Sequence, residues 1–160
     1  MKRSLRSLLA AILLVGCIQS SPAQWVQTNG PCGGHVYAFA SIGTDLFAGL
    51  ENGVYRSTNN GDSWTTVNAG IEPGTVQSLA VAGTKLFAGT LNNGVFLSTD
   101  NGGTWTAASS GLVKRMIYSL AIMPEGAGGT NMFAGTSGDG VYRSTNSGMT
   151  WTPANAGIGA

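Results

Sequence analysis

Residues 98–105 read STDNGGTW, and the same turn recurs twice, as STNNGDSW at residues 57–64 and STNSGMTW at residues 144–151. The third position is Asp or Asn, whose side-chain oxygen accepts backbone N–H groups within its own turn. The fifth position is glycine, which adopts a positive φ without steric cost. The final tryptophan is expected to bury its ring against the hairpin that it closes. Three copies in register predict one structural unit used three times.

The repeat extends upstream of this turn, with a second and a third shared segment in each unit. The second segment reads LFAG, LFAG and MFAG at residues 46–49, 86–89 and 132–135, and the third reads GVYRS, GVFLS and GVYRS at residues 53–57, 94–98 and 140–144. The third unit is longer, and its extra residues fall at 124–130, where we expect a longer hairpin loop.

Each unit contains four short β-rich runs separated by turn residues. In the second unit the runs cover residues 76–81, 86–90 and 95–98, and a fourth begins near Trp105. No stretch has the period of 3.6 residues that indicates a helix. Four antiparallel strands in a unit of about 40 to 45 residues are typical of a β-propeller blade. The sequence therefore predicts an all-β protein made of such blades.

These segments resemble the Asp-box, or BNR, repeat of sialidases, xyloglucanase-type glycoside hydrolases, sortilin-type receptors and a photosystem II assembly factor family. The resemblance covers nearly all of residues 24–160 and implies a β-propeller in which the box fastens a turn remote from any active site. Only Asp100 keeps the aspartate of the box. No glutamate follows at the spacing of a calcium loop, so we expect no metal and no cofactor. The structural box residues are Ser57, Asn59, Gly61, Trp64, Ser98, Asp100, Gly102, Trp105, Ser144, Asn146, Gly148 and Trp151.

The predicted propeller is incomplete. The blades cover about residues 35–73, 74–114 and 115–160, and a partial unit covers residues 24–34, where WVQTNG parallels the end of a unit. Propellers usually close with four to eight blades, and an open propeller leaves sheet edges exposed. We expect either a fragment of a longer product or a short form that completes itself by self-association through its open edges.

The first residues are expected to be an export signal. Lys2, Arg3 and Arg6 precede an apolar run at residues 8–15. Two ends for this segment remain open: cleavage after residue 23, or a lipobox whose lipidated cysteine is Cys17, which would limit the signal to residues 1–16. Either end predicts an extracytoplasmic protein, secreted, periplasmic or anchored at the outer membrane by lipid. Cys32 would then have no disulfide partner in the chain.

The composition excludes several classes of protein. The net charge is +1 with 9% charged residues, and loss of the first 23 residues leaves five basic against seven acidic side chains. Nucleic-acid binding is excluded because it needs a basic patch. The composition, with 42% hydrophobic residues and a net charge of +1, also argues against disorder, because disordered segments combine low hydrophobicity with high net charge. No apolar run is long enough for a membrane-spanning helix.

The candidate binding residues lie in the loops between units and in the turns between second and third strands, which emerge on one face of a propeller. We call this the binding face, and its candidates are His35, Glu51, Glu72, Lys114, Arg115 and Asp139. The opposite face carries Asp45, Asp62, Lys85, Asp100 and Glu125. Tyr37 and Tyr118 flank the binding-face loops, whereas the other aromatic residues are expected to pack between blades. A nucleophilic Cys32–His35 pair would lack an obvious third group to orient the histidine.

No catalytic residue is assigned. A sialidase-like site needs several arginines around one carboxylate, but Arg56 and Arg143 occupy equivalent repeat positions, which indicates a structural role. A glycosidase needs two carboxylates roughly 5 to 9.5 Å apart, and only Glu51 and Glu72 share the binding face. The favoured hypothesis is an exported, non-catalytic propeller that binds a protein or glycan or acts as a scaffold. The alternative is a truncated or degenerate glycoside hydrolase of the sialidase or xyloglucanase kind.

Overall fold

The computed structural model describes residues 30–31, 34–113, 115–124 and 130–158. The predicted export signal, Cys17, Cys32, Lys114 and most of the partial unit at residues 24–34 lie outside these residues. The described residues form no helix that is long and apolar enough to cross a membrane.

Three four-stranded antiparallel sheets make up the fold, each with its strands in sequence order. This confirms the all-β prediction of three blades. The first sheet contains β1 (Val36–Ile42), β2 (Asp45–Leu50), β3 (Gly53–Ser57) and β4 (Thr65–Thr66). The second contains β5 (Val76–Ala82), β6 (Lys85–Thr90), β7 (Gly94–Ser98) and β8 (Thr106–Ala107). The third contains β9 (Ile117–Pro124), β10 (Thr130–Thr136), β11 (Gly140–Ser144) and β12 (Thr152–Pro153).

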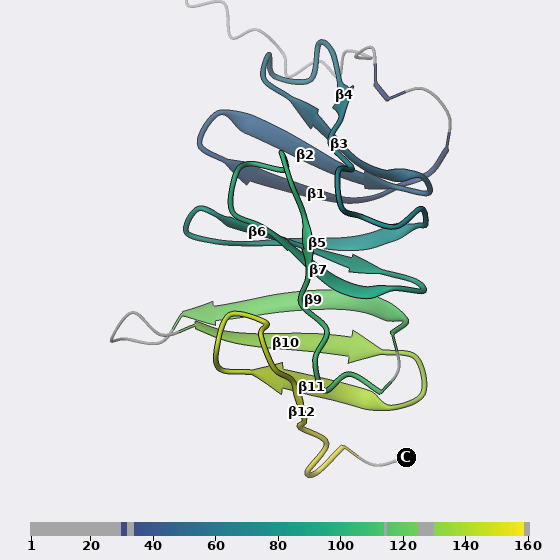
Figure 1. Cartoon of the computed structure of the whole chain (residues 1–160), viewed down its shortest axis with the longest axis vertical. Coiled ribbons are helices and arrows are strands. Elements are labelled where there is room, and N and C mark those ends of the chain that lie inside the picture. The colour runs from purple at the N-terminus through teal and green to yellow at the C-terminus, as the bar shows by residue number, and fades with distance from the viewer. Residues whose placement is uncertain (1–29, 32–33, 114, 125–129, 159–160) are drawn as a thin grey trace, which may run out of the picture.

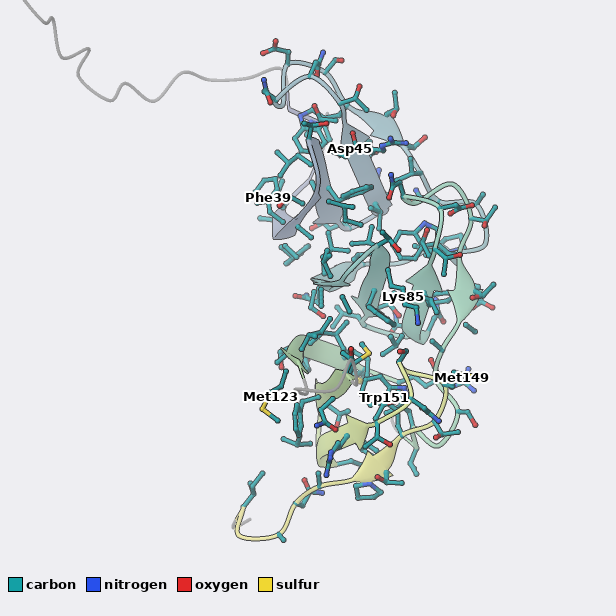
Figure 2. The ribbon with its side chains drawn as sticks, turned by 90° about the vertical axis from the view of Figure 1, so that its left-hand side faces the viewer. Phe39, Asp45, Lys85, Met123, Met149 and Trp151 are labelled. Carbon is teal, nitrogen blue, oxygen red and sulfur yellow. The ribbon has the colours of Figure 1, made fainter. Side chains whose placement is uncertain are left out.

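The three sheets are stacked along the long axis of the molecule, with the first strand of each sheet beside that of the next (Figure 1). Asp45 and Lys85, which begin β2 and β6, therefore lie at corresponding places in neighbouring blades (Figure 2). In the third blade Pro124 pairs with Thr130, so the extra residues of this unit join two neighbouring antiparallel strands, as the repeat predicted.

The core lies between blades because a four-stranded sheet has two faces and no helix among the described residues covers either of them. Phe47 and Val54 of the first blade are fully buried against Leu86, Phe96 and Trp105 of the second. The same pattern recurs between the second and third blades, where Phe87 and Val95 meet Met132, Tyr142 and Trp151. The second blade thus packs one face of its sheet against the first blade and the other face against the third.

Two faces of the stack have no neighbouring blade among the described residues. On the first blade Phe39 is 59% exposed, and on the third Met123 is 52% and Ile158 is 55% exposed. Figure 2 labels Phe39 and Met123 on these two blades. Phe39, which is expected to pack between blades, has no neighbouring blade on its side among the described residues. The equivalent Leu79 of the second blade is partly buried in the core between blades.

Candidate functional site

The repeated turns have the geometry that their sequence predicted. In the second blade Ser98 Oγ donates to Asp100 Oδ1 over 2.8 Å and accepts the N–H of Gly102, also over 2.8 Å. Asp100 Oδ1 also accepts the N–H of Thr104 over 2.8 Å. The glycine has a φ of +82°. The residue before it also has a positive φ, 54° at Asn101, which sequence reasoning missed although Asn tolerates this conformation better than most residues.

The first and third boxes show that an amide can replace the carboxylate. Asn59 and Asn146 accept the equivalent backbone N–H, and the Asn146 amide adds a 2.8 Å hydrogen bond to Thr150 Oγ1. In the second box the backbone N–H of Thr104, its hydroxyl and Ser98 lower the pKa of Asp100, in that order of importance. No group of three or more potential metal ligands occurs in the described part of the chain. The box is thus a hydrogen-bonded turn.

Two of the tryptophans that end the boxes pack between blades, as expected for the aromatic residues of the repeat, and not against the hairpin that they close. Trp105 Nε1 donates over 2.7 Å to the carbonyl of Val67, and Trp151 Nε1 donates over 2.8 Å to that of Ala108. Both acceptors belong to the preceding blade, so these rings fasten one blade to another and not their own hairpin. Trp64 of the first blade instead donates to Gly61 in its own turn and stays half-buried.

The best-formed polar group on the binding face is made by His35, Tyr37 and Glu51. His35 precedes β1, Tyr37 lies in the irregular start of β1, and Glu51 lies in the turn between β2 and β3. The pairing of β1 with β2 brings these segments together. His35 Nδ1 lies 2.8 Å from Glu51 Oε1, and the Tyr37 hydroxyl donates to the same oxygen over 3.1 Å. The Glu51 carboxylate therefore orients His35, a contact that the sequence did not predict.

The electrostatics of this group keep Glu51 ionised. The hydrogen bond with His35 is the largest cause of the lowered pKa of Glu51, followed by the hydrogen bond from Tyr37. The pKa of Tyr37 is raised by partial loss of hydration and by the neighbouring carboxylate, so the phenol remains a donor. All three side chains are exposed. An exposed carboxylate flanked by an imidazole and a phenol ring can accept hydrogen bonds from a ligand.

The other candidates of the binding face do not join this group. Glu72 is exposed and makes no hydrogen bond or ion pair with the described residues. Arg115 accepts the N–H of Gly94 with its backbone carbonyl, and its side chain is exposed. Asp139 accepts from Asn155 with its backbone carbonyl, and its buried Oδ2 has no hydrogen-bond partner among the described residues.

The two repeated arginines are engaged within their own sheets. Arg56 Nη2 lies 2.5 Å from Asp45 Oδ2, and Arg143 Nε donates over 2.9 Å to Asn131 Oδ1. Asp45 and Asn131 both begin or nearly begin the second strand of their blades. The structural role inferred from repetition agrees with these contacts. Sequence reasoning missed the partners, which the diagonal placement of neighbouring strands brings into reach.

The comparisons with known proteins identify the repeat and the fold. Residues 96–107 match the family model of the BNR/Asp-box repeat. No curated protein matches. The GH74 xyloglucanase from Xanthomonas campestris is similar over 78% of this chain and 24% of its own, with a TM-score of 0.56 and 20% identity. The GH74 enzyme of Niastella koreensis is similar over 74% of this chain and 22% of its own, with a TM-score of 0.55 and 24% identity.

A third similar structure is that of YCF48 bound to D1 peptide, with a TM-score of 0.51 and 15% identity over 81% of this chain and 43% of that one. The chain spans less than a quarter of the length of the two GH74 chains. These likenesses establish blades of the β-propeller kind.

Proposed function

We propose that this chain of β-propeller blades with a BNR/Asp-box repeat is an exported, non-catalytic module that binds a glycan or protein ligand on its binding face. The observation that carries this proposal is the exposed group of His35, Tyr37 and Glu51. His35 and Glu51 are specific to the first blade: Thr75 and Met116 replace His35 in the other two blades, and Leu91 and Ser137 replace Glu51. A group that the repeat does not require for packing is free to serve a ligand.

The chemistry of Glu51 does not suit the general acid of a glycosidase. A glycosidase acid must hold its proton near neutral pH, which requires a raised pKa. The pKa of Glu51 is lowered instead. Arg56 and Arg143 are engaged by Asp45 and Asn131, which supports the view that they do not form a carboxylate-binding cluster.

The ligand class follows from the mixture of ring and carboxylate. Sugars offer hydroxyl donors to a carboxylate and apolar C–H faces to an aromatic ring, and peptides offer N–H donors and side chains. Tyr118 supports an extended site because it occupies the strand position equivalent to Tyr37 and is 51% exposed. Among the similar structures, the GH74 protein from Xanthomonas campestris is described as a xyloglucanase and YCF48 as bound to a peptide, so both ligand classes are represented on this fold.

Titration with xyloglucan oligosaccharides, sialyllactose and a peptide library, followed by calorimetry, tests this proposal. A ligand that binds here should lose at least tenfold in affinity with Glu51→Gln and with Tyr37→Ala. The matched control is Glu72→Gln, on the same face but outside the group, which should leave affinity unchanged. Equal losses in Glu51→Gln and Glu72→Gln would place the ligand elsewhere.

The hydrolase alternative rests on the similarity of the fold to GH74 enzymes. Incubation with xyloglucan and with a sialoside, followed by a reducing-sugar or free sialic acid assay, decides between the two. Release of product by the native protein that is abolished by Glu51→Gln, with folding intact, would overturn the non-catalytic proposal.

Export is part of the proposal and has its own measurement. The intact mass of the protein from the cell envelope should correspond either to a chain that begins at Gln24 or to one that begins at a lipidated Cys17. An intact Met1 in the mature protein would refute export.

A further inference from the structure

The two outer faces of the stack resemble the two sides of the interface that joins neighbouring blades. We call the outer side of the first blade the leading face, which includes Val36, Phe39, Leu46, Tyr55 and Trp64. We call the outer side of the third blade the trailing face, which includes Met123, Phe133, Val141, Ala154 and Ile158. The equivalent positions of the inner blades are where the blades pack on one another.

Both internal interfaces join a trailing face to the leading face of the next blade with the same contacts. The tryptophan of the later blade donates its Nε1 proton to a carbonyl of the earlier one. The backbone N–H of the same tryptophan also donates to the earlier blade, at Ala69 for Trp105 and at Ser110 for Trp151, over 2.8 Å each. The contact is therefore directional: a trailing face fits a leading face.

A glycine makes room for this contact on each trailing face. Gly70 and Gly111 have φ values of +93° and +88°, and a Cβ on either would collide with the carbonyl of the tryptophan that follows. Gly157 is the equivalent residue of the third blade and has a φ of +81°. Nothing lies within 4 Å of the place where its Cβ would be. The trailing face of the third blade thus has the shape of the internal ones, without the tryptophan that fills them.

The leading face of the first blade likewise lacks the contacts that the leading faces of the other two blades make with a preceding blade. Trp64 Nε1 donates over 3.1 Å to Gly61 in its own turn, whereas its counterparts Trp105 and Trp151 donate to the preceding blade. Val36 is 42% exposed, whereas the equivalent Val76 and Ile117 are fully buried. The leading face of the first blade therefore has the residues of an inner face without a partner among the described residues.

We propose that these two faces bind each other between two copies of the chain, head to tail. Trp64 of one copy then donates to the carbonyl of Ala154 of the second copy, and its backbone fits over Gly157. Two copies contribute six blades, which lies within the four to eight blades that close a propeller. Closure would bury both pairs of open faces. Further blades of a longer polypeptide, or the chain's own residues 25–30, are the competing occupants.

Light scattering on the purified full chain after export, over a range of concentrations, is the first test. The expected species has twice the mass of one chain and does not grow further with concentration. Phe39→Asp and Ile158→Asp should each give monomers or open, weak dimers. A mixture of the two variants should form a dimer, because each retains the face that the other has lost. The control Val113→Asp, at a site 76% exposed, should leave the native dimer intact.

A second pair of variants tests the glycine. Gly157→Ala should weaken association at least tenfold, because the new methyl group meets the backbone of Trp64. Gly138→Ala is the matched control, since Gly138 has a φ of +88° and also has nothing within 4 Å. It should carry the same local strain and leave association unchanged.

Three results would overturn the proposal. These are a monomer at high micromolar concentration, a Gly157→Ala variant that associates like Gly138→Ala, and Phe39→Asp and Ile158→Asp variants that do not complement each other. A native protein whose single chain carries further blades would also overturn it, because those blades would occupy the two faces.

Discussion

Replacing Trp151 with Phe tests whether the box tryptophans hold the blades together. The Trp151 side chain is 2% exposed, and its indole nitrogen donates to the Ala108 carbonyl of the preceding blade over 2.8 Å (Figure 2). Phenylalanine keeps the aromatic ring that fills this site but removes the donor and two ring carbons. The matched variant is Trp64→Phe, at the same box position in the first blade, where the indole donates only to its own turn.

The expected cost follows from the lost contacts. Two buried ring carbons are worth about 1.5 kcal/mol, at about 0.8 kcal/mol per buried CH₂ group. The Ala108 carbonyl left without its donor costs about 1 to 3 kcal/mol more. The Trp151→Phe variant should therefore lose about 2.5 to 4.5 kcal/mol of unfolding free energy, and Trp64→Phe less than about 1.5 kcal/mol. At about 2 to 4 °C per kcal/mol, the first loss lowers Tm by roughly 10 °C.

Urea unfolding followed by far-UV circular dichroism measures both variants. Both should be studied in the Ile158→Asp background, so that association through the open faces does not contribute to the stability and the contact of Phe39 with Trp64 is kept. A loss below about 1 kcal/mol in Trp151→Phe would refute the assigned role of the interblade hydrogen bond. Equal losses in Trp151→Phe and Trp64→Phe would show that the box tryptophan acts within its own turn, as the sequence alone suggested.

Three further predictions concern the turns and strands. Asp100→Asn should flatten the fall of Tm between about pH 5 and pH 2, because the lowered folded pKa of Asp100 adds stability that is lost as pH falls through it. Gly111→Ala should cost about 3 kcal/mol or more by calorimetry, because its methyl group meets the backbone of the next blade, whereas Gly83→Ala in an open turn should cost about 1 kcal/mol. Arg56→Leu should cost about 1 kcal/mol by leaving Asp45 unpaired, and adding Asp45→Lys should restore stability, because Leu and Lys occupy these positions in the middle blade.

The sequence predicted what happens within a unit better than what happens between units. Ser98, Asp100 and Gly102 could be assigned their roles because the turn closes on residues that adjoin them in sequence. The hydrogen-bond acceptor of the Trp151 indole could not be identified in this way, since Ala108 lies 43 residues earlier in another blade. Periodicity shows that a position recurs, and the partner of a recurring position is decided by how neighbouring blades stack.

The sequence predicted the face of the blades on which the candidate site lies, but not the hydrogen-bonded group of side chains that forms it. Sorting the loops by their place in a blade put His35 and Glu51 on the same side, because the start of the first strand and the end of the second are neighbours in an antiparallel sheet. Tyr37 lies within the shift of register between Val36 and Ala38, and its hydroxyl donates to Glu51. No motif in the sequence announces that irregularity.

The repeat itself separates structural residues from functional candidates. A side chain that recurs at the same place in all blades, as Ser57, Ser98 and Ser144 do, meets a demand that every blade shares. A ligand makes no such demand, because it meets each blade at a different place. The departures from the repeat are therefore where binding should be sought. On the binding face the hydrogen-bonded pair of His35 and Glu51 is such a departure, and a ligand bound there should recognise the first blade in preference to its neighbours.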